Sequence, residues 1–350
     1  MNGAALCSEL YCAVLFVLHC IAMYCIALCI VLYFICIVLY FLVVYCIVFF
    51  AFCCHLVLYC MYCIVLYIES YFGIAAGSKM VPYLEAKGTA AEASLDLGIE
   101  TKSGSADFCT KVDVENEKLV IDGIRRKFPN HNIIGEESVG VGTIPDLDPG
   151  VPTWIIDPID GTTNFSSGLH SLTCVSIGYC VDGKPVVGVI YAPGTNELYV
   201  AVDGCGAYRN GKPIFQDPNE STKSLGTAVV CNEMGYARNK ADMDTMMGAQ
   251  ARVMLKGCRA MRQLGSGCLD LCFVASGRLD VVYAGLCNEG WKPWDYAAGL
   301  LICKEAGCTM ESIKEQERSG CDGFDLYGKS VICGVSKELV DELRSVVLDK

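Results

Sequence analysis

Residues 154–165 read Trp154-Ile155-Ile156-Asp157-Pro158-Ile159-Asp160-Gly161-Thr162-Thr163-Asn164-Phe165, and this stretch decides the fold. Trp154, Ile155 and Ile156 predict a buried strand. An Asp at the end of such a strand is costly to desolvate unless a cation or several donors satisfy it. The Pro fixes the turn, the Gly permits close backbone approach, and the polar residues after it are typical of a helix start. The stretch therefore predicts a metal site beside an anion-binding helix end.

For an isolated Asp-Pro-x-Asp segment, an ordinary strand, turn and capped helix explain the residues equally well. Two further acidic segments favour the metal site. Gly135-Glu136-Glu137-Ser138 follows the apolar pair Ile133-Ile134, and Trp294-Asp295 begins a small-residue run typical of a helix. Four acids at three strand or helix ends can converge on hard cations, which take oxygen ligands.

Together these three segments resemble the inositol monophosphatase family of magnesium-dependent, lithium-sensitive phosphatases. The resemblance covers roughly residues 100–347, and smaller landmarks such as Lys102-Ser103-Gly104 and Gly265-Ser266-Gly267 agree with it in order and spacing. It implies an α/β fold, a layered αβαβα sandwich of the sugar-phosphatase type. It also implies a phosphoric monoester hydrolase, specifically a cytoplasmic, homodimeric inositol-phosphate phosphatase.

Helix and strand signals alternate along the chain in an order that fits such a sandwich. Residues 172–214 read as short apolar strands separated by turn pairs such as Asn210-Gly211, which predicts an antiparallel meander. The predicted helices are 114–127, 237–255, 266–276 and 337–347, and further strands are expected at 225–231 and 279–284.

The resemblance implies two or three magnesium ions. Asp157 would bridge two of them, with Glu136 and the backbone carbonyl of Ile159 at the first ion and with Asp160 and Asp295 at the second. Magnesium suits such a set of oxygen ligands. Every residue named in this set lies in one of the three acidic segments.

For catalysis the resemblance implies that Thr162, held by Asp113, orients a metal-activated water for attack on phosphorus, with Glu136 completing the catalytic set. The N–H groups of Gly161 and Thr162 would bind the phosphate oxygens. From the residues alone, Asp113 is an equally good helix N-cap, and the two roles are compatible.

Two residues are expected to act around the metal ligands. Glu137 would support a metal-bound water. The position of Lys102 next to Ser103-Gly104 implies a loop over the metals, although a solvated surface charge explains this lysine as well.

Substrate choice rests on fewer signals, because related phosphatases for histidinol phosphate, sugar phosphates and phosphoadenosine nucleotides share the same machinery. The turn Gly265-Ser266-Gly267 resembles the ring-contacting turn of the inositol enzymes. The family has a substrate-contacting Glu soon after the aromatic strand, where this chain has Ala284, so either Glu289 takes that role or the contact is lost. The expected substrate-binding set is Asp160, Gly161, Thr162, Gly265, Ser266, Gly267, Glu289 and Asp295.

Residues 1–78 form a hydrophobic, low-complexity segment with no Lys or Arg and only two acids, Glu9 and Glu69. Fragments of one five-residue cycle, Leu-Tyr-Cys-Ile-Val, recur in it, as at residues 62–67. A repeated pentanucleotide TTGTA translates to that cycle, so we interpret residues 1–73 as the product of a nucleotide repeat upstream of the true start. The catalytic domain is then expected at 79–350.

The competing interpretation of the N-terminal segment is a membrane anchor, because the apolar run is long enough for two or three crossings. It lacks the flanking Lys and Arg residues that orient a span and the basic region of a cleaved signal. An anchor would allow a function of another class, a catalytically idle, membrane-tethered binding protein.

The charge and cysteine content limit the kinds of binding partner and the cell compartment that the sequence predicts. The net charge of −12 argues against nucleic acid and offers no basic patch for a membrane surface. The thirteen cysteines from Lys79 onward show no paired metal-binding spacing and read as reduced thiols of a cytoplasmic protein.

If residues 1–73 derive from a repeat upstream of the start, mapping of transcript 5′ ends should place most starts downstream of them, and peptides from this segment should be missing from the mature protein. Abundant peptides from residues 1–73 would contradict this interpretation.

Overall fold

The structure is a computed structural model that describes residues 43–104, 107–216, 223–236, 238–287, 290–314 and 323–349. The chain divides into two compact units, Met1–Val65 and Leu66–Lys350. Helix α2 (Val43–Ala86) runs through the boundary, and every other described element lies in the second unit. The predicted site residues all lie in this second unit.

The described helices after α2 are α3 (Lys111–Lys127), α4 (Glu136–Val139), α5 (Thr162–Ser167), α6 (Lys240–Lys256), α7 (Gly267–Ala275), α8 (Pro293–Glu305) and α9 (Lys337–Leu348), with short 3-10 turns η1 (Ala90–Ser94), η2 (His170–Leu172) and η3 (Leu225–Thr227). The strands are β1 (Glu100–Gly104), β2 (Asp107–Cys109), β3 (Asn132–Gly135), β4 (Thr153–Asp160), β5 (Cys174–Val181), β6 (Lys184–Ala192), β7 (Glu197–Val202), β8 (Ala207–Arg209), β9 (Lys212–Ile214), β10 (Val229–Glu233), β11 (Ala260–Arg262), β12 (Val281–Ala284), β13 (Thr309–Glu311) and β14 (Val331–Gly334).

A seven-stranded sheet carries the acidic strand β4. Its order is β3-β4-β5-β6-β7-β8-β9; β3 and β4 are parallel, and each later pair is antiparallel. The turns Asp182-Gly183 and Asn210-Gly211 have positive φ at both residues. This is the conformation that two-residue hairpin turns need in order to match the twist of their strands. The antiparallel meander predicted for residues 172–214 is confirmed.

A second sheet has five strands in the order β11-β10-β12-β14-β13. Strand β10 is parallel to β11 and β12, whereas β14 is antiparallel to β12 and β13. Strands β12 and β14 are buried along their whole length. Continuous burial is expected of strands that helices cover on both faces.

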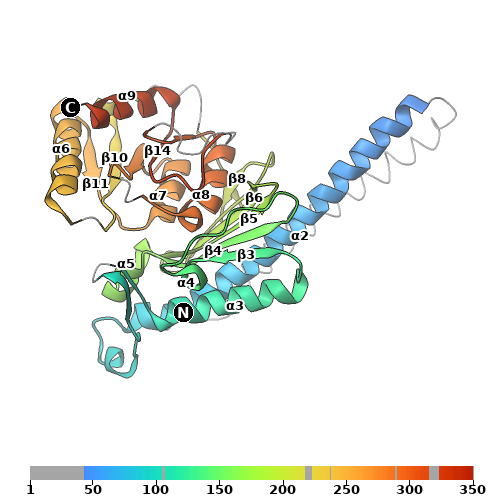
Figure 1. Ribbon diagram of the computed structural model, residues 1–350, viewed down its shortest axis with the longest axis horizontal. Coiled ribbons are helices and arrows are strands. Elements are labelled where there is room, and N and C mark those ends of the chain that lie inside the picture. Colours follow the sequence, from blue (N-terminus) through green and yellow to red (C-terminus); the bar gives the residue numbers. More distant parts are fainter. Residues whose placement is uncertain are drawn as a thin grey trace. The chain divides into compact units, whose positions relative to one another are not determined.

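Helices α7 and α8 lie between the two sheets. Helix α8 contacts β5 and β6 of the first sheet and β13 of the second, and α7 contacts β12 and β14. On the outer faces, α3 packs on β4, and α9 packs on β14 beside α6. Figure 1 shows these layers in the unit from Leu66 onward. The predicted layered αβαβα sandwich is confirmed, with the inner faces of both sheets and α7 and α8 forming its core.

The C-terminal part of α2 joins α3 in the outer layer of the seven-stranded sheet. A Cβ atom at Gly123 of α3 would lie 2.0 Å from Cζ of Phe72 of α2. A Cβ atom at Gly77 of α2 would lie 2.6 Å from Cδ1 of Tyr191 on β6. Glycine at these two positions therefore lets two helices and a strand approach closely.

One described segment, Tyr62–Ala86 of α2, is long and apolar enough to cross a membrane by length and composition. The same segment carries a buried row of side chains four residues apart, which is the pattern of a helix packed against a core. The row is Ile68, Phe72, Ala76, Met80 and Leu84. Helices in a protein core can be equally long and apolar, so the length and hydropathy of this segment are consistent with a core helix as well as with an anchor.

We expect Gly123→Ala to lower the free energy of unfolding by about 1–3 kcal/mol, because overpacking against Phe72 outweighs the better helix propensity of Ala. Gly248 of α6 is a matched control, since a Cβ atom there meets only the end of the Arg252 side chain, at 3.2 Å. Gly248→Ala should leave the stability unchanged or raise it. Denaturant titration measures both, and equal effects would contradict the close contact of α2 and α3.

Candidate functional site

The end of β4 brings two carboxylates to one place. All eight residues of β4 are buried, and Asp157 is only 1% exposed. In a regular strand, residues three apart point to opposite faces. The pairing of β4 with β5 is irregular between Asp157 and Asp160, with Pro158 inside the irregular stretch. This bulge turns both Asp side chains toward the same site.

Helix α8 supplies the third carboxylate. Asp295 is the third residue of α8, and its Oδ2 accepts a hydrogen bond of 2.7 Å from the backbone N–H of Lys292. Ligand atoms of Asp157, Asp160 and Asp295 all lie within 4.8 Å of one another. The structure therefore brings Asp295 to two acids that precede it in the sequence by more than a hundred residues.

Such a group strongly favours a bound cation. Burial, followed by the charges of Glu136 and Asp160, raises the pKa of Asp157 well above its ordinary value. Burial and the charge of Asp160 do the same to the pKa of Asp295. A hard divalent cation offsets this repulsion and takes carboxylate oxygens as ligands, so the residues fit magnesium.

Glu136 and Glu137 begin α4 and meet Lys102. The Nζ atom of Lys102 lies 2.8 Å from Oε1 of each glutamate. The close group of three aspartates does not include Glu136, although the charge of Glu136 raises the pKa of Asp157. Burial and the charge of Glu136 raise the pKa of Glu137 to about 7.

Glu117 is a buried residue of α3 that the sequence argument missed. Its carboxylate accepts hydrogen bonds of 2.7 Å from the backbone N–H groups of Glu137 and Ser138. A Cβ atom at Gly135 would lie 2.4 Å from Oε2 of Glu117, so a glycine is required there. Glu117 therefore fixes the start of α4, and its place on α3, four residues after Asp113, was the one available signal.

Thr162 and Asp113 lie together as expected. Oγ1 of Thr162 lies 3.3 Å from Oδ1 of Asp113 and 3.0 Å from the carbonyl oxygen of Ile159. Oδ2 of Asp113 accepts hydrogen bonds from the N–H and hydroxyl of Thr110, which makes Asp113 part of a capping box for α3. The expectation that Asp113 is the N-cap is therefore wrong, because Thr110 takes that position; Asp113 caps from the third helical residue and also contacts Thr162. Burial raises the pKa of Asp113 to about 6, although the hydrogen bonds from Thr110 lower it.

The predicted ring-contacting turn, residues 265–267, is tied to Asp160. Oδ2 of Asp160 accepts hydrogen bonds from the hydroxyl of Ser266, at 2.5 Å, and from the N–H of Cys268, at 2.8 Å. Gly265 has a φ of 75°, and a Cβ atom at Gly267 would lie 2.8 Å from the Trp291 ring. The small residues that the sequence singled out are therefore required by close contacts.

Two further residues missed from the sequence hold this turn in place. Nδ2 of Asn164, on α5, donates to the carbonyl oxygens of Leu264, at 2.7 Å, and Leu172, at 2.9 Å. Oε1 of Glu233, on β10, accepts 2.8 Å hydrogen bonds from the N–H groups of Leu264 and Gly265. The contacts of Asn164 and Glu233 with Leu264 join residues 100 and 31 positions apart, so no local pattern could have shown them.

The position where the family has a substrate-contacting Glu holds Ala284 on β12. Ala284 is buried and pairs with Glu233 of β10. The Oε1 atom of Glu233 already holds the turn. Glu289, the proposed replacement, lies outside the described residues.

Comparisons with known proteins agree with this geometry. The sequence model of the inositol monophosphatase family matches residues 74–348. Inositol monophosphatase 2 of Solanum lycopersicum is 44% identical over 228 residues, which are 65% of this chain and 81% of that protein. A fructose-1,6-bisphosphatase/inositol-1-monophosphatase of Thermotoga maritima is 33% identical over 245 residues, 70% of this chain and 87% of that one. The crystal structure of the extragenic suppressor protein suhB from Bartonella henselae gives a TM-score of 0.67 at 26% identity, over 81% of this chain and 98% of that one.

We expect Mg²⁺ to raise the unfolding temperature, and the gain to grow as the pH rises. The raised pKa values of Asp157 and Asp295 mean that the folded protein keeps protons that the unfolded chain loses above about pH 4. Without metal, stability therefore falls as the pH rises above that value. The ionised carboxylates formed at higher pH are the ligands that Mg²⁺ needs. Thermal unfolding with and without Mg²⁺, between about pH 5 and about pH 8, measures the effect.

Asp157→Asn should abolish the gain from Mg²⁺. Asp148→Asn is the matched control, because Asp148 is an exposed aspartate. A gain that persists in Asp157→Asn, or that is lost in Asp148→Asn, would contradict the metal site.

Proposed function

The chain belongs to the inositol monophosphatase family and is a phosphoric monoester hydrolase, and from this premise we propose that it hydrolyses inositol monophosphates to myo-inositol and phosphate. The family, generally Mg²⁺-dependent, is the one predicted from the sequence, and that prediction is confirmed. The observation that carries the proposal is the convergence of Asp157, Asp160 and Asp295 in the segments that the family match covers.

Those three aspartates would hold two or three Mg²⁺ ions, together with Glu136 and the carbonyl oxygen of Ile159. Carboxylate and carbonyl oxygens are the ligands that Mg²⁺ takes. When bound, Mg²⁺ neutralises charge on the phosphate and lowers the pKa of water. Glu136 is held by Lys102, so we propose that Lys102 gives up this contact when the metals bind and keeps its contact with Glu137.

Thr162 and Asp113 would position the attacking water. The Thr162 hydroxyl has one proton, which it can donate to the carbonyl of Ile159 or to Asp113, at 3.0 and 3.3 Å. Its oxygen can then accept a hydrogen bond from water. A water held in this way presents its own lone pair to phosphorus.

The start of α5 would bind the phosphate group. Gly161 is the N-cap of α5, with a φ of 83°, and its carbonyl accepts the N–H of Phe165 at 2.8 Å. The N–H groups of Gly161 and Thr162 precede this first intrahelical bond, so α5 gives them no partner. Backbone N–H groups at such a position suit phosphate oxygens.

Inositol monophosphates are proposed because of the turn Gly265-Ser266-Gly267, which is tied directly to Asp160. Ala284 and the name of the Thermotoga relative, a fructose-1,6-bisphosphatase/inositol-1-monophosphatase, favour an alternative, the same chemistry on a sugar phosphate or another small phosphate. Glu289→Gln should raise KM for inositol phosphate selectively if Glu289 binds a ring hydroxyl. An unchanged KM would show that this contact is lost.

The test is phosphate release by the full chain with Mg²⁺ from inositol 1-phosphate, histidinol phosphate, fructose 1,6-bisphosphate and phosphoadenosine phosphate. We expect the highest kcat/KM on inositol 1-phosphate. A higher kcat/KM on another substrate would support phosphatase activity but overturn the assignment of inositol phosphate as the substrate. No release from any of them would favour a catalytically idle protein.

Variants separate the roles within the same assay. Asp157→Asn should abolish release, whereas Asp148→Asn should match the parent chain. Thr162→Val should lower kcat on the order of 10²-fold, the lower end for loss of a proton-handling group, whereas Thr162→Ser keeps a hydroxyl and most of the activity. An active Thr162→Val would contradict the proposed water-positioning role.

We further propose that residues 79–350 act as a cytoplasmic, homodimeric catalytic domain with no nucleic-acid partner, and that residues 1–73 are dispensable for catalysis, although their removal takes Ile68 and Phe72 out of the buried row of α2 and lowers stability. The buried cysteines of the second unit, such as Cys174, Cys231 and Cys303, are free thiols, which fits a reducing compartment. Light scattering tests the dimer. Cell fractionation tests the compartment, and recovery of the protein with membranes would favour the anchor.

A further inference from the structure

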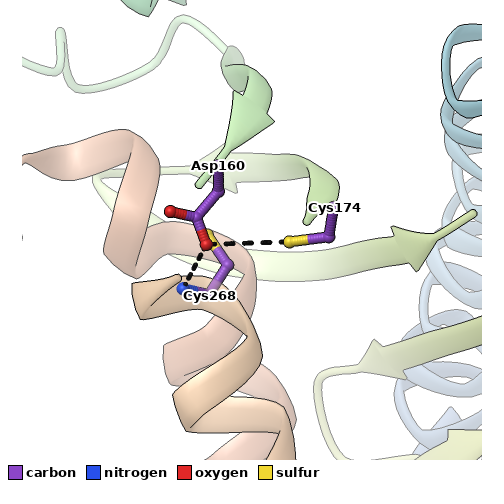
Figure 2. Close-up of side chains that lie close together, drawn as sticks. All are labelled: Asp160, Cys174 and Cys268. Carbon is purple, nitrogen blue, oxygen red and sulfur yellow. Dashed lines mark hydrogen bonds between the residues drawn. The ribbon is translucent and has the colours of Figure 1, made fainter. Parts of the chain in front are cut away.

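Two buried cysteines lie beside Asp160. Figure 2 shows Cys174, at the start of β5, and Cys268, in the first turn of α7, next to the carboxylate at the end of β4. Sγ of Cys174 lies 3.7 Å from Oδ2 of Asp160, and one ligand atom from each of the three residues lies within 4.8 Å of the other two. Both cysteines are fully buried. Two sulfur atoms and one carboxylate oxygen therefore lie close together.

The spacing fits a tetrahedral metal site. With metal–sulfur bonds of about 2.3 Å and metal–oxygen bonds of about 2.0–2.2 Å, sulfur and oxygen ligands lie roughly 3.5 Å apart and two sulfurs roughly 3.8 Å apart. The observed sulfur–oxygen distance is 3.7 Å. The hydroxyl of Ser266 lies 3.9 Å from Sγ of Cys174 but donates a 2.5 Å hydrogen bond to Oδ2 of Asp160, so it would have to move away from that oxygen to serve as a fourth donor.

The donor atoms differ in kind from those of the three aspartates. Thiolates select soft divalent cations, whereas sets of oxygen ligands select magnesium. Figure 2 shows one oxygen of Asp160 directed to the cysteines and the other pointing away from them. Asp160 can therefore contribute to a soft site through one oxygen and to the aspartate group through the other.

We propose that Asp160, Cys174 and Cys268 form a second metal site, which takes a soft divalent cation such as Zn²⁺ or Cd²⁺ and inhibits the phosphatase when filled. The inhibitory part of this proposal rests on the proposed function. Binding releases the two thiol protons and forms two metal–sulfur bonds.

Inhibition follows from what Oδ2 of Asp160 already does. It accepts the Ser266 hydroxyl and the Cys268 N–H, the two hydrogen bonds that fix the turn 265–267. A cation bound to Oδ2 competes with these bonds. It therefore disturbs the predicted ring-contacting turn and one proposed magnesium ligand at once.

The ordinary explanation is that both thiols are buried hydrogen-bond donors. Cys174 donates to Asp160, and Cys268 donates to the carbonyl oxygen of Asp295 at 3.5 Å. In that case neither thiol binds a metal, and removing one does not change the response to soft cations.

The test uses Cd²⁺ on the full chain at saturating Mg²⁺, with ultraviolet sulfur-to-cadmium absorption and phosphate release as readouts. We expect the parent chain to gain absorption and lose activity, with no recovery on adding Mg²⁺ and recovery on adding a dithiol chelator. Cys174→Ala and Cys268→Ala should each need at least tenfold more Cd²⁺ for half-inhibition, relative to their own activity. They should also show less absorption than the parent chain. Cys308→Ala is the matched control, because Cys308 is a partly buried cysteine outside the site.

Equal Cd²⁺ sensitivity in the parent and both variants, or recovery on adding Mg²⁺, would overturn the soft site and assign the inhibition to the three aspartates. The absorption needs no turnover. If no substrate is hydrolysed, stronger absorption in Asp157→Asn than in Asp157→Asn/Cys174→Ala would still support the soft site while the proposed function fails. Equal absorption in those two variants would overturn the soft site.

Discussion

The repulsion among Asp157, Asp160 and Asp295 is the constraint on which the rest of the structure depends. Ligand atoms of the three carboxylates lie within 4.8 Å of one another. Burial raises the pKa of Asp157 and of Asp295 well above their ordinary values, and the charge of Asp160 adds to both shifts. The fold has to supply enough well-packed surface elsewhere to hold this arrangement. It does so with the sandwich, which buries α7 and α8 between two sheets and brings the start of α8 to the end of β4.

Hydrogen bonds from distant residues then fix the polar turns around the acids. Glu117 holds the start of α4, Asn164 holds the carbonyls of the turn after β11, and Glu233 holds the N–H groups of the same turn. Each of these side chains is paired to backbone groups that would otherwise be costly to bury. The turns that carry Glu136 and Ser266 are therefore positioned by partly buried polar contacts rather than by apolar packing alone.

Asp160 joins these two features. One of its oxygens is anchored by Ser266 and Cys268, and a ligand atom of the same side chain belongs to the aspartate group. Any group that competes for the anchored oxygen disturbs both the turn and the aspartates. The two cysteines beside it make soft cations the chemical class best suited to do so. The proposed hard and soft metal sites therefore share one carboxylate.

By itself, the sequence determined the family, the layered α/β fold and the acids of the site, because these depend on local patterns: apolar strands that end in Asp, hairpin turn pairs and helix starts. Only the tertiary structure decided which groups meet. Glu136 pairs with Lys102 and lies outside the group of three aspartates. Other elements supply the remaining side chains around the site, which are Glu117, Asn164, Glu233 and the two cysteines. Such contacts join residues up to about a hundred positions apart, and a linear pattern cannot show them, because the packing of sheets and helices sets their distances.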